Sequence, residues 1–305
     1  MGHVKRWVSG VTILLASLGS FMTLLAEDES LNLVERSADV KRSVDAASFE
    51  VVRHAIEEMP EGSLVILDCT RTLMEPVDAI LRYGKWAQLT EATLGRPLSV
   101  TEARYLKLLR DWQSKKQLTH PDWPVVIQAA AARGVHLMVL TKHPVGYVDE
   151  EYPPFEGVRI QQMRALGLDF RSMSPRVDVQ KMKSLLPGRE VSYAGGILFA
   201  PDGMKGPIVD ALLRSSCQEY TKILIVDDSE TQCLDMEQML TTRAIDSAVL
   251  RFTEANDRRP SVDPSVAALQ LRTLFQDDVW LSDEAASLQI QQQSPNPSSA
   301  PASEA

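Results

Sequence analysis

Short apolar runs alternate along the chain with longer segments in which apolar residues recur every three or four positions. The runs at 64–67, 135–140 and 223–226 are almost wholly apolar, which is typical of strands buried on both faces of a sheet. Ser229, with Gln232 three residues later, forms a capping-box pattern that predicts the start of a helix. The same kinds of pattern predict helices at 46–59, 124–133 and 206–215, a helix from 230 to about 241, a hairpin over 191–200 and a strand at 248–250. Because strands alternate with helices, we expect a parallel sheet covered by helices.

The first 26 residues have the layout of a secretory signal. Lys5 and Arg6 precede residues 8–26, which contain no charged side chain, and Ala26 is a suitable last residue before cleavage. Nineteen uncharged residues would also just span a membrane as an uncleaved anchor. The small and hydroxylated residues in this run favour cleavage. Either form would place the rest of the chain outside the cytoplasm, in the periplasm or as a secreted protein.

The other end of the chain differs in composition from the segments before it. Residues 285–305 are rich in Gln, Ser, Pro and Ala and have almost no large apolar side chains. Such a segment cannot bury enough surface to offset the entropy of ordering, so we predict a disordered tail. The signal at 1–26 and this tail leave one α/β domain at about 44–283.

The negative net charge argues against nucleic acid as a binding partner. The formal net charge is −9, whereas sequence-independent binding to nucleic acid depends on clustered Lys and Arg. We therefore expect no nucleic-acid partner and no membrane contact beyond the N-terminal segment. The three cysteines are too few for a disulfide framework and show no zinc-ligand spacing.

Polar residues follow three of the predicted strands. Asp68 follows the first strand, Thr141 the second, and Asp227 with Asp228 the third. Lys205 lies at the start of a predicted helix. A single Asp after a strand often only caps the next loop, but two adjacent carboxylates repel each other unless a cation lies close to them. Since ligands of open α/β sheets bind beyond the carboxyl ends of the strands, the set predicts an oxygen-rich site suited to Mg²⁺ and phosphate.

Four segments resemble the motifs of the haloacid dehalogenase superfamily. They are VILDCTRTL (65–73), HLMVLT (136–141), MKGPIVDALL (204–213) and ILIVDDSE (223–230), and their order and spacing agree with that family. More narrowly, GGILFA followed by KG, IVDD and a capped helix is similar to a bacterial family of unknown function, DUF2608. The resemblance covers about 200 residues. It implies a Rossmann-like three-layer α/β/α sandwich with a small helical cap inserted after the first strand.

The resemblance implies a phosphohydrolase or phosphotransferase that acts through an aspartyl-phosphate. Asp68 would be the catalytic nucleophile, while Thr141 and Lys205 would bind the oxygens of the phosphoryl group. The implied partner is a small phosphorylated substrate. If the protein only binds, its partner is instead an unidentified ligand or protein.

The resemblance also implies a Mg²⁺ cofactor that neutralises charge on the phosphoryl group. Its ligands would be the Asp68 carboxylate, the backbone carbonyl of Thr70 and the Asp227 carboxylate. Asp228 would either bind a water of the metal or hold Lys205.

One catalytic position departs from the family pattern. The family has a second Asp two residues after the nucleophile, where it acts as general acid and base, but this chain has Thr70. Loss of such a group commonly costs about two to four orders of magnitude in rate. Cation-transport ATPases of the same superfamily also read Asp-x-Thr-x-Thr-Leu, so phosphoryl transfer itself is compatible with Thr70. We favour a slow Mg²⁺-dependent phosphatase, and the alternative is a protein that kept the fold for binding and lost catalysis.

An insertion of helical character, at about 74–122, follows the first motif. In the family such an insertion forms a cap over the active site. Its basic residues are Arg82, Lys85, Arg104, Lys107, Arg110, Lys115 and Lys116. They form either solvated helix faces, which we favour, or contacts to an anionic substrate. His143, two residues after Thr141, lies at the rim of the predicted site, where we favour a surface loop residue over a general base. Arg71 either touches substrate or pairs with an acid.

Overall fold

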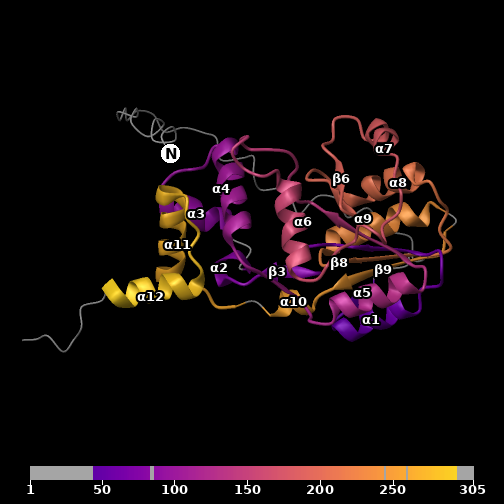
Figure 1. The fold of residues 1–305 in the computed structure, drawn as a ribbon, viewed down its shortest axis with the longest axis horizontal. Helices are drawn as coiled ribbons and strands as arrows, with labels where there is room; N and C mark the ends of the chain where they lie inside the picture. Colours follow the sequence, from indigo (N-terminus) through magenta and orange to yellow (C-terminus); the bar gives the residue numbers. More distant parts are fainter. Residues whose placement is uncertain (1–43, 83–85, 244, 259, 294–305) are drawn as a thin grey trace, which may run out of the picture. The chain divides into compact units, whose positions relative to one another are not determined.

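A seven-stranded sheet forms the centre of the fold (Figure 1). The computed structural model describes residues 44–82, 86–243, 245–258 and 260–293. The sheet strands are β1 (Val44–Ala46), β2 (Leu64–Leu67), β5 (His136–Thr141), β6 (Ser192–Ala194), β7 (Ile197–Phe199), β8 (Ile223–Asp227) and β9 (Ser247–Phe252). Their order is β1-β9-β8-β2-β5-β7-β6, and neighbouring strands are parallel except for β6 and β7.

Helices cover both faces of this sheet, which gives the predicted Rossmann-like three-layer α/β/α arrangement. The helices that pack on the sheet are α1 (Phe49–Glu57), α5 (Trp123–Ala132), α6 (Phe155–Ala165), α7 (Val179–Leu185), α8 (Lys205–Ser215) and α9 (Glu230–Thr241), and a short helix, α10 (Glu254–Asp257), follows β9. Figure 1 shows α1 and α5 on one side of the strands and α8 and α9 on the other.

The side chains of β2 show why helices cover both faces of the sheet. Val65 and Leu67 belong to the apolar cluster that contains α1 and α5 residues, whereas Leu64 and Ile66 belong to the cluster that contains α7, α8 and α9 residues. Successive side chains of a strand point to opposite faces, so a strand buried on both faces must be apolar throughout. This is the pattern that identified the three central strands from the sequence.

The first helix begins later than its pattern predicts. Residues 44–46 form the edge strand β1 beside β9, and α1 begins only at Phe49. Ser229 caps α9 as predicted, because its Oγ accepts from the Gln232 N–H, but the Gln232 side chain accepts from the Lys205 N–H instead of completing a capping box.

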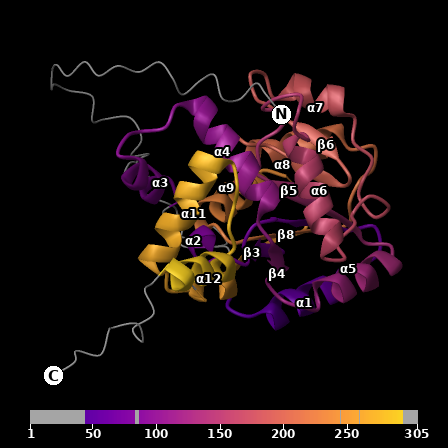
Figure 2. The same cartoon turned by 60° about the vertical axis from the view of Figure 1, so that its left-hand side comes forward.

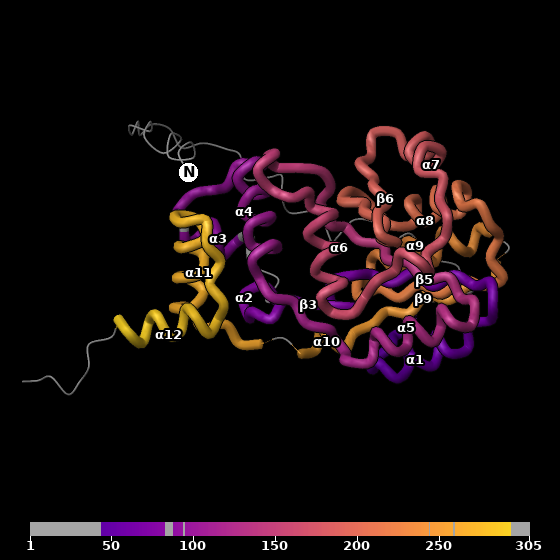
Figure 3. Tube along the Cα trace, viewed as in Figure 1, coloured from indigo at the N-terminus to yellow at the C-terminus, as the bar shows by residue number. Residues whose placement is uncertain are grey.

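A smaller group of helices, separate from the three layers, contains the inserted segment. The antiparallel hairpin of β3 (Met74–Pro76) and β4 (Lys116–Leu118) begins and ends an insertion made of α2 (Ala79–Arg82), α3 (Trp86–Leu94) and α4 (Val100–Gln113). Two C-terminal helices, α11 (Pro264–Asp277) and α12 (Asp283–Gln293), lie beside them (Figures 2 and 3). We call α2, α3, α4, α11 and α12 together the cap.

Apolar residues from both segments fill the interior of the cap. Leu106 and Leu109 of α4 cluster with Leu271 and Leu274 of α11 and with Trp280, which follows α11. The sequence predicted the inserted part of the cap but not the contribution of α11 and α12.

The predicted tail begins too early. Residues 285–293 belong to α12, Ala286 is fully buried, and the Asp283 carboxylate accepts from the N–H of Ala79 (2.8 Å). Contacts with the distant segment at 78–79 thus order a helix that is poor in apolar residues. Residues 294–305 lie outside the described residues.

The predicted signal at 1–26 also lies outside the described residues. Within the part of the chain that is described, no helix is both long enough and apolar enough to cross a membrane.

Candidate functional site

The predicted site residues meet at the carboxyl ends of three neighbouring strands. β2 lies between β5 and β8, so Asp68, Thr141 and Asp227 lie at one edge of the sheet. The Asp68 N–H donates to the Val226 carbonyl (2.8 Å), which continues the β2–β8 pairing up to the site residue. The parallel sheet therefore brings together residues that are far apart in the sequence.

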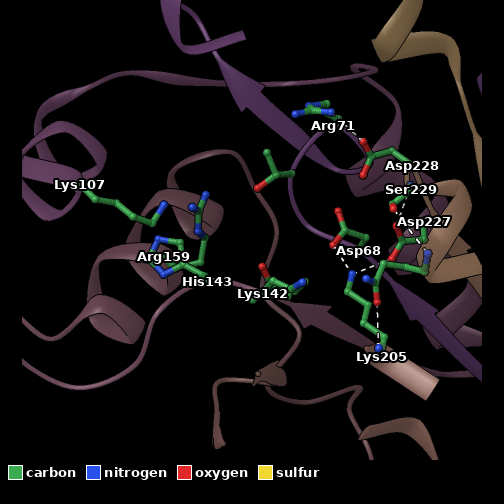
Figure 4. A pocket seen from close by; sticks show the side chains of 13 residues that line it. Asp68, Arg71, Lys107, Lys142, His143, Arg159, Lys205, Asp227, Asp228 and Ser229 are labelled. Carbon is green, nitrogen blue, oxygen red and sulfur yellow. Dashed lines mark hydrogen bonds and ion pairs between the residues drawn. The ribbon is translucent and has the colours of Figure 1, made fainter. Parts of the chain in front are cut away.

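Lys205, the first residue of α8, joins two of these strand ends. Its Nζ donates to Asp68 Oδ1 and Asp227 Oδ2, both at 2.6 Å (Figure 4). It also donates to the Leu140 carbonyl at 3.2 Å. An ammonium group has three donors, and all three are used. Lys205 thus holds two carboxylates in place, and it would have to exchange one of these bonds to reach a phosphate. Of the two adjacent acids, Asp227 accepts from Lys205, whereas Asp228 does not.

Burial and mutual repulsion set the charges of this group. Burial raises the pKa of Asp68 to about 7; Lys205 opposes this shift, and Asp227 and Asp228 add to it. Burial lowers the pKa of Lys205, but Asp68 and Asp227 outweigh it and hold that pKa above its ordinary value. Burial is the main cause that raises the pKa of Asp228, and the neighbouring charge of Asp227 raises it further.

The loop after Asp68 places Arg71 beside Asp228. Arg71 has a left-handed backbone (φ 66°), which is uncommon for a residue other than glycine, and its N–H donates to the Met74 carbonyl (2.9 Å). Its Nη1 lies 3.3 Å from Asp228 Oδ2 and 3.4 Å from Asn256 Oδ1. Of the two roles predicted for Arg71, pairing with an acid is the one the structure contains, although Arg71 also lines the pocket.

A pocket of about 330 Å³ opens over the strand ends. Its lining includes all the predicted site residues, namely Asp68, Thr70, Thr141, Lys205, Asp227 and Asp228. Thr70 is exposed, whereas Thr141 is buried. Oδ2 of Asp68 has no hydrogen-bond partner in the described part of the chain, so one oxygen of this carboxylate is oriented by Lys205 and the other is open to a ligand.

The donor chemistry at the strand ends fits a hard divalent cation. Three carboxylates, Asp68, Asp227 and Asp228, lie there with two basic side chains, Lys205 and Arg71. Among the described residues, however, no three His, Cys, Asp or Glu side chains are grouped so as to hold a metal ion. A cation at this place would therefore depend on two carboxylates, the Thr70 carbonyl and water, a set that suits Mg²⁺, which usually keeps several waters.

The wall opposite the carboxylates is basic. Lys107 of α4, Arg159 of α6 and His143, which follows β5, line the pocket on that side (Figure 4). His143 is only 4 % exposed, so its prediction as a surface loop residue is wrong; Nε2 lies 3.3 Å from Asp111 Oδ2. Burial and Arg159 lower the pKa of His143 to about 3, so the ring is neutral at physiological pH.

Asp111 is the centre of this basic wall. Its buried carboxylate lies within 4.0 Å of Lys107, Arg110, Lys116, His143 and Arg159. Sequence reasoning missed both Asp111 and Arg159. The spacing of Lys107 and Asp111 on one helix was the only local signal, and such i,i+4 pairs are common on solvated helices.

The basic residues of the insertion therefore have different roles. Arg82 pairs with Glu75 (3.4 Å), Arg104 donates to the Val145 carbonyl (3.1 Å), and Lys115 is exposed. The favoured interpretation of solvated helix faces is wrong for Lys107, Arg110 and Lys116, which converge on Asp111. Lys85 lies outside the described residues.

Fold and site together define an α/β protein with a polar pocket at the carboxyl edge of a parallel sheet, beside a helical cap. The chain belongs to the DUF2608 family, a family of proteins of unknown function, whose family model matches residues 45–287. This match confirms the narrower of the two resemblances seen in the sequence. No curated protein and no solved structure matches the chain.

Proposed function

We propose that this protein is a Mg²⁺-dependent phosphohydrolase or phosphotransferase of the haloacid dehalogenase type, acting through an aspartyl-phosphate at Asp68. One observation carries the proposal: the Lys205 ammonium bridges Asp68 and Asp227 at 2.6 Å to each, at the ends of neighbouring parallel strands. A buried lysine between two carboxylates orients the first carboxylate and leaves its other oxygen open. That is the arrangement a carboxylate nucleophile requires.

The first step would transfer the phosphoryl group to the protein. Asp68 Oδ2 forms a bond to phosphorus while the bond from phosphorus to the ester oxygen breaks, and the leaving oxygen takes a proton from water. Thr141 would donate its hydroxyl to a phosphoryl oxygen. Lys205 would keep Asp68 in place and balance part of the negative charge. A bound Mg²⁺, held by Asp68, Asp227 and the Thr70 carbonyl with Asp228 close by, would supply further charge neutralisation.

The second step would release the phosphoryl group. Water, or the hydroxyl group of an acceptor, attacks phosphorus, the bond to Asp68 breaks, and the attacking oxygen loses its proton to solvent. No carboxylate lies at position 70 to take that proton. His143 has a pKa of about 3 and is therefore a weak base. We expect slow turnover and a long-lived phospho-aspartate for this reason.

Activity measurements with Mg²⁺ test the proposal. A panel of phosphomonoesters should be hydrolysed slowly, Asp68→Asn should abolish that activity, and Thr70→Asp should raise it by about two orders of magnitude or more. Beryllofluoride with Mg²⁺, which mimics a phospho-aspartate, should raise the melting temperature of the wild-type protein but not that of Asp68→Asn. Asp210→Asn, which removes a partly exposed acid of α8 outside the pocket, is the matched control.

The proposal fails if no phosphomonoester of the panel is hydrolysed and beryllofluoride gives no stabilisation. Thr70 favours a second candidate, a protein that binds an anionic ligand in this pocket without turnover. It predicts ligand binding that survives Asp68→Asn and no gain of activity in Thr70→Asp.

We further propose that the protein acts outside the cytoplasm. The support is the basic start and uncharged run at residues 8–26. Cell fractionation of the expressed full chain, with N-terminal sequencing of the recovered protein, tests both export and cleavage after Ala26.

A further inference from the structure

The basic wall of the pocket has more positive charge than its own carboxylate can balance. Asp111 lies 3.1 Å from Lys107 Nζ, 2.7 Å from Arg110 Nη2, 3.8 Å from Lys116 Nζ and 4.0 Å from Arg159 Nη2. Four cations thus surround one carboxylate, which itself is only 3 % exposed. Buried charges are stable only when they are paired and hydrogen-bonded, and one carboxylate cannot pair fully with four basic side chains, so the group is suited to bind another anion.

The four cations divide into two groups by position. Arg110 and Lys116 do not line the pocket, and Arg110 donates to Asp111 Oδ1 from both Nε (3.0 Å) and Nη2 (2.7 Å). Lys107 and Arg159 do line the pocket. Arg110 and Lys116 therefore balance the charge of Asp111, whereas Lys107 and Arg159 face the space where a ligand would lie.

Arg159 is the least satisfied member of the wall. Its side chain is only 6 % exposed, and its Nη2 lies 4.0 Å from Asp111 Oδ2, which is too far for a hydrogen bond. Its Nε has no hydrogen-bond partner in the described part of the structure. An unmade hydrogen bond on a buried donor is costly, and a guanidinium presents its donors in a fork that matches an oxyanion. Because Arg159 also lines the pocket, its incompletely paired guanidinium points to a ligand with acceptor oxygens.

The neighbouring lysines respond to the same excess of charge. Burial lowers the pKa of Lys107 to about 8, against the opposing effect of Asp111, and Arg110 and Arg159 lower it further. Burial, Arg159 and Arg110 lower the pKa of Lys116 to about 7. An anion beside Lys107 and Arg159 would favour the charged forms of both lysines.

We infer that Lys107 and Arg159 bind a second anionic group of the substrate, on the wall opposite Asp68. The inference rests on the proposed function, since it places the reacting phosphoryl group at Asp68. The substrate class it defines is a small phosphomonoester with a phosphate or carboxylate at its other end. A pocket of about 330 Å³ is near the small end of the range of about 300–1,000 Å³ typical for ligand sites, which restricts the substrate to a small molecule.

Three ligands of equal chain length separate the contribution of the second anion. They are propyl phosphate, which has one anionic group, 3-phosphonooxypropanoate, which adds a carboxylate, and propane-1,3-diyl bisphosphate, which adds a phosphate. Calorimetry with the full-length Asp68→Asn protein and Mg²⁺ measures binding without turnover. We expect both two-anion ligands to bind at least tenfold more tightly than propyl phosphate, and the tighter of the two shows which anion the wall prefers.

Two variants assign that selectivity to the wall. Arg159→Gln and Lys107→Met, each in the Asp68→Asn background, should lower the ratio of two-anion to one-anion affinity at least fivefold, and Arg159→Lys should restore part of it. The matched controls are Arg164→Gln, an exposed arginine of the same helix α6, and Lys115→Ala, an exposed lysine between α4 and β4. Lys107 is about one-third exposed, so its variant remains informative if Arg159→Gln does not fold.

The outcomes separate this inference from the proposed function. Equal affinity for all three ligands, or selectivity that survives both Arg159→Gln and Lys107→Met, overturns the inference even if wild-type protein hydrolyses propyl phosphate. Selective binding of two-anion ligands by Asp68→Asn, with no hydrolysis of any of them by wild-type protein, supports the basic wall and overturns the phosphatase.

Discussion

A single carboxylate, Asp111, keeps four cations in the interior between α4, β4 and α6. Burial alone would raise its pKa, but Arg110 and Lys107, together with His143 and Lys116, hold that pKa well below the ordinary value. The same side chain therefore stays charged throughout the physiological range. Its backbone carbonyl also accepts from the Gln162 side chain of α6, so the residue joins the insertion to the sheet domain twice.

Asp111→Asn should destabilise the protein strongly. The substitution removes the charge that balances Lys107, Arg110, Lys116 and Arg159, and breaking a buried ion pair on one side costs about 3–5 kcal/mol. Urea unfolding at pH 7 measures the free energy of unfolding. Asp210→Asn is the control, because Asp210 is 32 % exposed and pairs with Arg243 and Arg214 near the surface. We expect that change to cost less than about 1 kcal/mol; equal losses for the two variants would contradict the role given to Asp111.

The sequence predicted one half of the site and missed the other for a physical reason. Asp68, Thr141 and Asp227 each end a strand of recognisable apolar pattern, and parallel strands bring such ends together without any knowledge of side-chain packing. Arg159 and Asp111 lie within helices whose positions depend on how the insertion packs against the sheet. No local pattern determines that packing, so their meeting could not be predicted.

At the scale of elements, the close contact of α8 with α9 fixes the position of Lys205. Gly206 lies next to Lys205, and its N–H donates to the Asp235 carboxylate of α9. A Cβ built on Gly206 would lie 2.6 Å from Asp235 Oδ2 and 2.8 Å from the Asp235 carbonyl oxygen. Only glycine permits the two helices to approach this closely.

Gly206→Ala should therefore move the start of α8 and weaken the site. We expect a loss of about 1–3 kcal/mol of stability from the overpacked contact, together with weaker binding of Mg²⁺ and beryllofluoride because Lys205 is displaced. Thermal unfolding with and without these ligands measures both effects.

Gly157→Ala is a matched control on α6. A Cβ there would meet only the Pro154 ring, at 3.4 Å, so the usual helix preference of Ala over Gly should leave stability unchanged or raise it by up to about 1 kcal/mol. A Gly206→Ala protein that behaves like Gly157→Ala would show that α8 does not depend on the close approach.

The elements that the sequence did not predict are those with weak local signals. β1 has only three residues, two of them exposed, and it becomes a strand because β9 offers an unpaired edge. α12 is poor in apolar side chains and is ordered by contacts of Asp283 with the backbone N–H of Ala79 and the side chain of Gln270. The central strands and α5, α8 and α9 have strong patterns and lie within about two residues of their predicted positions.

At the scale of the whole described chain, the cap has its own apolar interior. Leu271→Ala should cost about 2–5 kcal/mol, because this leucine of α11 is 3 % exposed and contacts residues of the insertion. The loss should appear locally: amide hydrogen exchange should become faster in α3, α4 and α11 and stay unchanged in β2 and β8.

Leu288→Ala, at a position of α12 that is 51 % exposed, is the control and should change stability by less than about 0.5 kcal/mol. Faster exchange in the central strands of Leu271→Ala would mean that cap and sheet unfold as one unit.

The division of the cap between two parts of the chain has a consequence for the order of folding. β9, the last strand of the sheet, ends at Phe252, whereas α11 begins at Pro264. A chain folding from its N-terminus can therefore pair all the strands of the sheet while the apolar side of α4 is still uncovered. Leu106 and Leu109 are shielded from water only after α11 has packed against α4. An intermediate with a paired sheet and an undocked α11 would expose apolar surface on the inserted helices.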